Sequence, residues 1–332
     1  MLYTENFSGL KQNEETLVDT ESITEVSSGE SACRVEIEEG YSYIQGSVYG
    51  GGDLGQIGKG IIDTSNNTAT ISEEGRTEVK VENGYIGGSV FGGGNGIPES
   101  GTYQLKMGTV YGSTKVEING GYIEENVYGG GKQSRIYFSN LSDASIKTAT
   151  EVVIKEVEEE IVIKGSVFGG GDRGNSATTN ASVPTTIGDV LVRIEGKEEG
   201  SKIYFLTGGV YGDGNLCLVK GVRTIELENY NTNAETLKTF RSLQRADKVI
   251  LRNTDIVLLG AVDLVEEGDN TVYSINRVSV LRLEEGSTIK LDQIVKYLGQ
   301  IESDYEFIES DDTETRKFVD KGNNGENGYS YY

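Results

Sequence analysis

The sequence of 332 residues contains 46 glycines but only 2 prolines, it has no histidine, and its formal net charge is −23. Collagen and proline-rich disorder are excluded because both need proline alongside glycine. The negative charge argues against nucleic acid and anionic membrane surfaces as partners. The missing histidine excludes Ser-His-Asp triads and histidine-bound zinc.

The first residues, Met1 to Glu5, have neither the basic nor the apolar region of a signal peptide. No apolar run approaches the ~18 residues that span a bilayer, so we expect no membrane insertion. Residues 1–30 are interpreted as an N-terminal flank or cap. Cys33 and Cys217 lie far apart in the sequence and indicate no disulfide framework. We expect a small buried side chain at Cys33, in a position where other repeats carry valine.

A glycine-rich motif repeats through residues 31–215. The motif Val-Tyr/Phe-Gly begins at five valines, separated by 42, 37, 40 and 43 residues: Val48, Val90, Val127, Val167 and Val210. A shorter copy begins at Val110, between the second and the third. One structural repeat therefore has either about 40 residues or about 20, and in the second case alternate repeats carry the full glycine turn.

Segments of alternating β-branched and charged residues, such as 35–37, 79–82 and 116–119, precede the glycine turns. This alternation is typical of strands with one buried face. Because one repeat alone buries too little apolar surface, the repeats have to stack. We therefore predict an all-β fold, a right-handed parallel β-helix in which the five valines form one inward column. With repeats near 20 residues, the column from Val48 to Val210 would be a rod of roughly 40 Å.

The glycines are expected at corners where φ is positive or where backbones approach too closely for a Cβ atom. A rival interpretation rests on Asn83-Gly84, because Asn-Gly between alternating hydrophobic residues favours two-residue β-hairpins. A chain of hairpins would give an antiparallel meander or sandwich. The β-helix is preferred because whole motifs repeat in register while the inserted loops vary in length.

The motif in residues 114–131, Thr-x-Val-x-Ile-x-Gly-Gly-x-Ile-x-x-x-Val-Tyr-Gly-Gly-Gly, resembles that of adhesin-like repeat proteins on the surface of anaerobic gut bacteria. The resemblance covers residues 31–215. It implies a β-helix within a larger exported protein whose signal peptide and wall anchor lie outside the repeats. This sequence contains neither, so an extracellular or cell-surface location is an expectation from the resemblance. The motif implies little about the ligand.

Residues 216–300 lose the glycine motif. Leu237, Phe240 and Leu243 have helical spacing after a candidate N-cap at Asn233, which predicts one short flanking helix over 234–245. Apolar segments from 249 to 291 predict further solenoid rungs or a cap. Residues 301–332 are an acidic and Gly/Asn-rich tail, which we expect to be solvated chain.

Polar residues follow the glycine turns at equivalent positions: Asp53, Asn95, Lys132, Asp172 and Asn215, with Asp213 beside the last. Stacked turns would align them in one column, whose carboxylates and amides would be candidate ligands for calcium or sugar hydroxyls. The structural alternative is that Asn and Asp tolerate left-handed turns and satisfy turn backbone. The wide spacing and the lysine argue against a calcium cage, so we expect no metal and no cofactor.

Two aromatic columns accompany the repeats. The first directly follows the inward valines and comprises Tyr49, Phe91, Tyr111, Tyr128, Phe168 and Tyr211. Strict alternation points these rings outward, where they would stack either on sugar rings or, as we favour, on one another over the glycine turns. The second comprises Tyr43, Tyr85, Tyr122 and Phe205, with a break at Val162.

These features favour a structural or adhesive solenoid without catalysis, which presents a repeated surface to a glycan or to a protein of a host or neighbouring cell. One alternative is a polysaccharide lyase or hydrolase; glycoside hydrolysis would need two carboxylates about 5–10 Å apart in one cleft. Another alternative is a phage tail or filament subunit. The fold alone does not decide between them.

Overall fold

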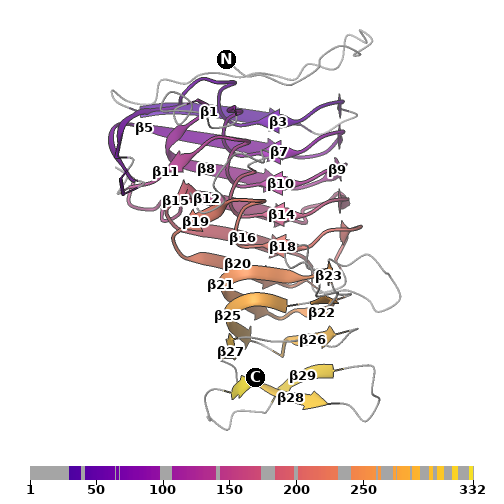
Figure 1. Ribbon diagram of the computed structural model, residues 1–332. Coiled ribbons are helices and arrows are strands. Elements are labelled where there is room, and N and C mark those ends of the chain that lie inside the picture. The colour runs from indigo at the N-terminus through magenta and orange to yellow at the C-terminus, as the bar shows by residue number, and fades with distance from the viewer. Residues whose placement is uncertain are drawn as a thin grey trace.

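The computed structural model is an elongated all-β solenoid whose rungs follow one another from the N-terminal to the C-terminal end (Figure 1). It describes residues 30–38, 42–63, 65–66, 68–97, 107–139, 143–172, 184–197, 201–230, 241–258, 261–262, 272–273, 275–284, 286–291, 299–301, 305–309, 316–320 and 329–331. Successive rungs are joined by parallel strand pairs. The predicted parallel β-helix is confirmed.

The strands of the repeat region form four faces, named A to D. Face A holds the long strands β1 (Glu30–Ile37), β5 (Thr68–Val81), β8 (Val110–Ile118), β12 (Thr150–Lys155), β16 (Val190–Glu195), β20 (Arg223–Glu228), β21 (Leu243–Arg252) and β25 (Ile275–Glu284). Face B holds β2 (Tyr43–Ile44), β6 (Tyr85–Ile86), β9 (Gly121–Ile123), β13 (Ile161–Ile163) and β17 (Ile203–Phe205). Face C holds β3 (Val48–Tyr49), β7 (Val90–Phe91), β10 (Val127–Tyr128), β14 (Val167–Phe168) and β18 (Val210–Tyr211). Face D holds the first residues of β8, then β11 (Ile136–Tyr137), β15 (Pro184–Ile187) and β19 (Leu218–Lys220).

The five glycine-turn valines form one buried column on face C, in the register Val48, Val90, Val127, Val167 and Val210. One rung is therefore the whole interval between motifs, and the alternative of rungs near 20 residues is wrong. The shorter copy at Val110 pairs with Ile136 on face D of the same stack. Four steps of strand spacing make the column about 19 Å long, half the expected rod.

The hairpin interpretation of Asn83-Gly84 is wrong. Tyr85 pairs in parallel with Tyr43 on one side and with Tyr122 on the other. Gly84 instead turns the chain from face A to face B with a φ of 109°. Such a backbone favours glycine, so the expectation of positive φ holds at this corner.

Polar side chains inside the solenoid connect its faces and its rungs. The hydroxyls of Thr77, Thr114 and Thr150 on face A each donate to a turn carbonyl opposite, at 2.6 Å: Gly92, Gly129 and Gly169. Between faces B and C, a side-chain oxygen in each rung accepts the backbone N–H of the next: Ser47, Ser89, Asn126 and Ser166. Both sets recur in successive rungs. The first joins two faces of one rung, and the second holds neighbouring rungs in register.

The triple-glycine turns need glycine because adjacent turns lie directly on each other. A Cβ atom on Gly130 would lie 2.7 Å from the backbone nitrogen of Gly171, and one on Gly93 would lie 2.8 Å from that of Gly131. None of these glycines has a positive φ. Of the two reasons expected from sequence, close backbone approach is the right one here.

An antiparallel hairpin crosses the parallel rungs. Strand β4 (Lys59–Asp63) pairs with the first half of β5. The apolar side chains of this hairpin, Ile62, Ala69 and Ile71, pack on Tyr111, Tyr137 and Ile187 of face D. Its Asn66 carbonyl accepts a hydrogen bond from Lys220 of β19, at 2.8 Å. The hairpin thus covers the outer side of face D across several rungs.

The predicted helix over 234–245 is wrong in its described part. Leu243 begins β21, is fully buried, and pairs with Val210 and Ile275 as the next member of the valine column. Strand pairing on both sides outweighs the helical spacing of the sequence. Residues 231–240 lie outside the described part, and no helix occurs within it. Strand β21 then continues from face C to face A without an intervening strand, so this rung has no strand on face D.

The C-terminal rungs end in antiparallel pairs. The parallel pair β22 (Asp255–Leu258) and β26 (Thr288–Leu291) extends the core through Ile256 and Ile289. The remaining strands are β23 (Ala261–Val262), β24 (Val272–Tyr273), β27 (Gly299–Ile301), β28 (Tyr305–Glu309), β29 (Arg316–Asp320) and β30 (Tyr329–Tyr331). The acidic tail, expected as solvated chain, therefore contains strands, and β28 pairs with β29. Residues 1–29 lie outside the described part, so the N-terminal cap stays a prediction.

Gly130→Ala is expected to destabilise the solenoid by about 1–3 kcal/mol, because the added methyl group overpacks the glycine turn below it. Gly55→Ala is the matched control, since a Cβ atom there meets only one atom, at 3.9 Å. Chemical denaturation of both variants measures the difference. Equal midpoints for Gly130→Ala and the unmodified protein would show that the turns can separate to admit a side chain.

Candidate functional site

The polar residues after the glycine turns do form one column. Parallel bridges join Asp53, Asn95, Lys132, Asp172 and Asn215 in that order. The amide of Asn95 donates to the carboxylate of Asp53 at 2.9 Å, and the amide of Asn215 donates to that of Asp172 at 3.1 Å. The column therefore satisfies part of its own hydrogen bonding between rungs.

Left-handed backbone in these turns occurs one position later than expected. Leu54, Gln133 and Leu216 have φ values of 59°, 49° and 53°, and each follows a member of the polar column. The column residues themselves bridge neighbouring rungs as short extended segments. Tolerance of left-handed geometry is therefore not why Asp and Asn stand in the column.

Asp213 is separate from the column and is buried. Its carboxylate accepts the N–H groups of Gly214 and Val219 at 3.0 and 2.7 Å, and it lies 3.2 Å from the guanidinium of Arg223. Burial raises the pKa of Asp213, although these bonds and Arg223 oppose the shift. Arg223 also binds Asp247 through two nitrogens, at 2.8 and 3.0 Å. Asp213 thus belongs to an internal charge cluster.

The described residues contain no group of three or more His, Cys, Asp or Glu side chains able to hold a metal ion. In the polar column each rung contributes one side chain, so the carboxylate and amide oxygens are spread along a line. A calcium site needs several oxygens that converge on one point.

The aromatic column beside the inward valines is a buried stack. Centroids of successive rings lie 4.6–4.9 Å apart in Tyr49, Phe91, Tyr128, Phe168 and Tyr211. The first four rings are at most 7% exposed. The favoured structural interpretation is confirmed, because neighbouring rings cover the ring faces that a sugar would need. Tyr111 belongs to a different stack, with Tyr137 on face D.

A second tyrosine column lies on the outer side of face B. Tyr43, Tyr85 and Tyr122 stack at 4.9 and 5.4 Å, and Tyr43 is 55% exposed. Phe205 is not a member, because it pairs with Ile163 and is fully buried; Tyr204 takes the outward position opposite Val162. The predicted membership of Phe205 in this column is therefore wrong, whereas the predicted break at Val162 stands, because this valine lies between Tyr122 and Tyr204 in the register.

Beside these tyrosines, Glu124 forms an ion pair with Lys164 of the next rung. Hydrogen bonds from Lys164 and from the phenols of Tyr122 and Tyr85 lower the pKa of Glu124. Face B thus presents a row of phenol edges next to a charged pair.

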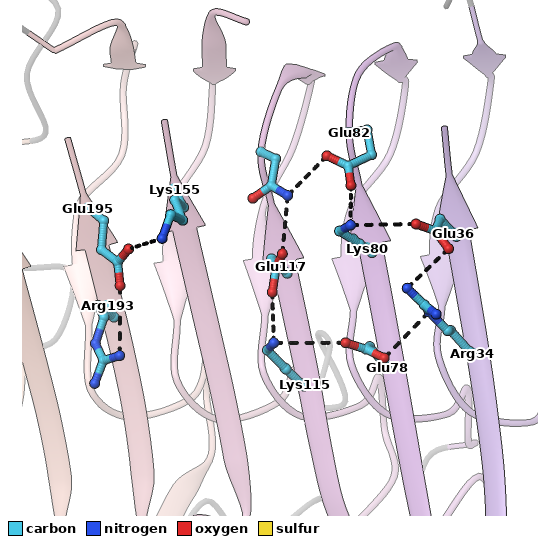
Figure 2. A network of polar contacts seen from close by, with 11 residues as sticks. Arg34, Glu36, Glu78, Lys80, Glu82, Lys115, Glu117, Lys155, Arg193 and Glu195 are labelled. Carbon is cyan, nitrogen blue, oxygen red and sulfur yellow. Dashed lines mark hydrogen bonds and ion pairs between the residues drawn. The ribbon is translucent and has the colours of Figure 1, made fainter. Parts of the chain in front are cut away.

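Face A presents columns of charged side chains on its outer side (Figure 2). Along one column the register runs Arg34, Glu78, Lys115 and Glu151, and along the next it runs Glu36, Lys80 and Glu117. Opposite charges alternate from rung to rung, and ion pairs join them within and across strands. Val153 follows Glu117 in its column and separates this network from a second one, which contains Lys155, Arg193 and Glu195.

A cleft of about 330 Å³ opens on this face, beside the segment 143–149. Its lining includes Arg34, Glu78, Lys115 and Glu151 of the first charged column, and Ile146 of the segment. Cys33 also lines the cleft; it pairs with Thr77, so the expected equivalence with valine fails, and it is half-buried. The sequence did not predict the cleft, because the segment 143–149 that borders it is not part of the recurring motif.

Comparisons with protein-family models, with curated proteins and with solved structures find no match for this chain. Among the described residues, no helix is long and apolar enough to cross a membrane.

Asp213→Asn is expected to raise stability near neutral pH, because asparagine keeps an acceptor oxygen without a buried charge. The folded-state pKa of Asp213 lies above its ordinary value of 3.8. The stability that this carboxyl contributes is therefore fully present below that value and falls as the pH rises through the folded pKa. The advantage of asparagine should grow from acidic to neutral pH in melting curves.

Asp247→Asn is the control with the opposite sign. Arg223 lowers the pKa of Asp247, so its contribution is present above 3.8 and is lost as the pH falls through the folded pKa. This variant should be less stable than the unmodified protein near neutral pH, with a smaller difference in acid. The same pH trend in both variants would contradict the assignment of Asp213 as the buried, desolvated partner.

Lys80→Glu should place three carboxylates in a row with Glu36 and Glu117. Directly opposed like charges destabilise a sheet, and such pairs contribute roughly 0.2–1 kcal/mol each. The measurement is urea denaturation of Lys80→Glu and Lys80→Met at low and high salt. We expect the glutamate variant to be the less stable at low salt and the gap to narrow at high salt, because salt screens exposed charges. A gap that is unaffected by salt would contradict an electrostatic role for the columns.

Proposed function

We propose that this chain is a structural and adhesive segment of a larger secreted or cell-surface protein, and that it presents a repeated surface for binding. The observation that carries the proposal is the recurrence of the same side-chain types on the outer faces. Tyrosines recur on face B, and alternating charges recur on face A. At each strand spacing of ~4.8 Å, an extended ligand would meet another tyrosine along the column of face B, or a charge of the opposite sign along a column of face A.

The architecture supports this role. Each rung buries its apolar residues against its neighbours, so rungs can be added without a new fold, and the outer faces lengthen in proportion. Many weak contacts along such a surface add up through effective concentration when several copies bind together. The net charge of −23 keeps separate copies soluble.

A second candidate function is a carbohydrate-active enzyme, and one observation favours it. Glu78 and Glu151 line the same cleft, two strand steps apart in one column, with Lys115 between them. Two steps correspond to about 9.6 Å between backbones, near the upper end of the range for inverting hydrolases. Glu78 is, however, ion-paired with both Arg34 and Lys115, at 3.5 and 3.8 Å. The adhesive role is therefore preferred.

Adhesion is tested with the chain coupled to inert beads, which are washed over surfaces coated with neutral polysaccharides, acidic polysaccharides and extracellular matrix proteins. We expect retention on at least one surface and weak binding of the uncoupled chain, because avidity needs many copies. The double variant Tyr85→Ala, Tyr122→Ala should reduce retention if face B contributes. Leu216→Ala, an exposed apolar position on neither face, is the control.

The same polysaccharides are assayed for new reducing ends and for unsaturated products. Turnover of any of them, abolished by Glu78→Gln or Glu151→Gln, would put the enzyme first. Retention on no surface, at a bead density that saturates with the chain, would overturn the adhesive proposal.

A further inference from the structure

Specific contacts hold in place the segment that borders the cleft on face A. The segment 143–149 is held against face A by an ion pair between Asp143 and Arg76 of β5, at 3.6 Å. Within this segment Asp143 also accepts hydrogen bonds from Ser145, at 2.9 and 2.7 Å. The volume of about 330 Å³ lies at the lower end of the about 300–1,000 Å³ typical of small-molecule sites.

The positively charged groups around the cleft already have carboxylate partners. Arg34 lies 3.1 Å from Glu36, Lys115 lies 2.7 Å from Glu117, and both also approach Glu78. The hydroxyls of Thr77 and Thr114, beneath the cleft, donate inward to turn carbonyls. The cleft is therefore rich in fixed donors and acceptors, with its positive charges balanced by carboxylates.

This chemistry selects against a strongly charged ligand. An anion would have to displace the carboxylates that hold Arg34 and Lys115, and it would approach a chain of net charge −23. Sugar hydroxyls suit the site better, because each both donates and accepts and can add to paired groups without separating them. Ile146 offers an apolar contact for the C–H face of a sugar ring.

We infer that this cleft binds a short segment of a neutral carbohydrate through Arg34, Lys115 and Glu151, with Ile146 as the apolar wall. The inference rests on the proposed binding role and assigns it a ligand class and a place. It can fail while the adhesive role stands, because the tyrosine column of face B is a separate surface.

Occupancy of the cleft is measured directly, by calorimetric titration of the whole chain. No label is needed, and the readout is independent of the bead adhesion assay.

The test titrates the chain with neutral di- and trisaccharides of glucose, galactose, mannose and xylose, and with oligogalacturonate as the acidic probe. We expect at least one neutral saccharide to bind, with little effect of salt on its affinity.

Lys115→Met and Glu151→Gln should weaken binding of that saccharide roughly tenfold each, since methionine removes a charged hydrogen-bond donor and glutamine replaces a charged acceptor with a neutral one. Lys155→Met is the matched control, because Lys155 lies on the same face outside the cleft and pairs with Glu195. Thermal melts check that all three variants fold. Binding of oligogalacturonate alone, binding of no saccharide, or equal affinities in Lys115→Met and Lys155→Met would overturn the inference. Bead adhesion that persists alongside any of these outcomes would leave the adhesive role intact, because face B is a separate surface.

Discussion

The structure depends on one constraint: each position in a rung packs against the same position in the rungs on either side, at the spacing of hydrogen-bonded parallel strands. A residue type whose side chain packs well against another residue of the same type can therefore recur in successive rungs. Valines fill the core column on face C, and aromatic rings stack face to face beside them. Side-chain oxygens at the corner between faces B and C accept from the backbone of the next rung. Each is a different interaction, and all satisfy the same spacing.

The glycine turns show the constraint at its tightest. The second glycine of each turn faces the backbone of the following turn, which leaves no room for a Cβ atom at Gly51, Gly93, Gly130 and Gly170. The fifth copy carries Asp213 at this place. The following rung has no glycine turn there, because Arg245 and Ala246 continue β21 directly to face A. The side chain thus becomes possible where the stack of turns ends, and Arg223 and Asp247 complete the cluster around it.

On the outside, the same spacing turns single residues into surfaces. Identical charges in one column would repel at the strand distance, and face A instead alternates Arg34, Glu78, Lys115 and Glu151. Tyrosines have no such conflict and repeat directly on face B. The charged columns of face A and the tyrosine column of face B therefore have the same cause: each position lies beside the same position of the next rung. This regularity is the feature on which the proposed binding role rests.

Departures from the repeat give the surface its individual features. The segment 143–149 borders a cleft on face A, and the hairpin of β4 and β5 covers face D. Neither segment contains the glycine motif. Features of this kind distinguish one place on a periodic surface from the next, and a specific ligand needs that distinction.

The sequence by itself determined the parallel β-helix, the inward valine column and the alignment of Asp53, Asn95, Lys132, Asp172 and Asn215, because motifs that repeat in register have to stack in register. It did not determine the length of a rung, since the shorter copy at Val110 has the same letters but lies on another face. Local spacing also misled at Leu243, where pairing with Val210 and Ile275 replaces a helix, and at Phe205, which points into the core in place of Tyr204. The reason is the same in each case. Periodicity along the chain records which residues alternate, whereas the partner on the neighbouring rung, some 40 residues away, decides which face they occupy. Only the tertiary structure decided the cleft. The fold places the segment 143–149 beside a charged column whose members come from four different strands.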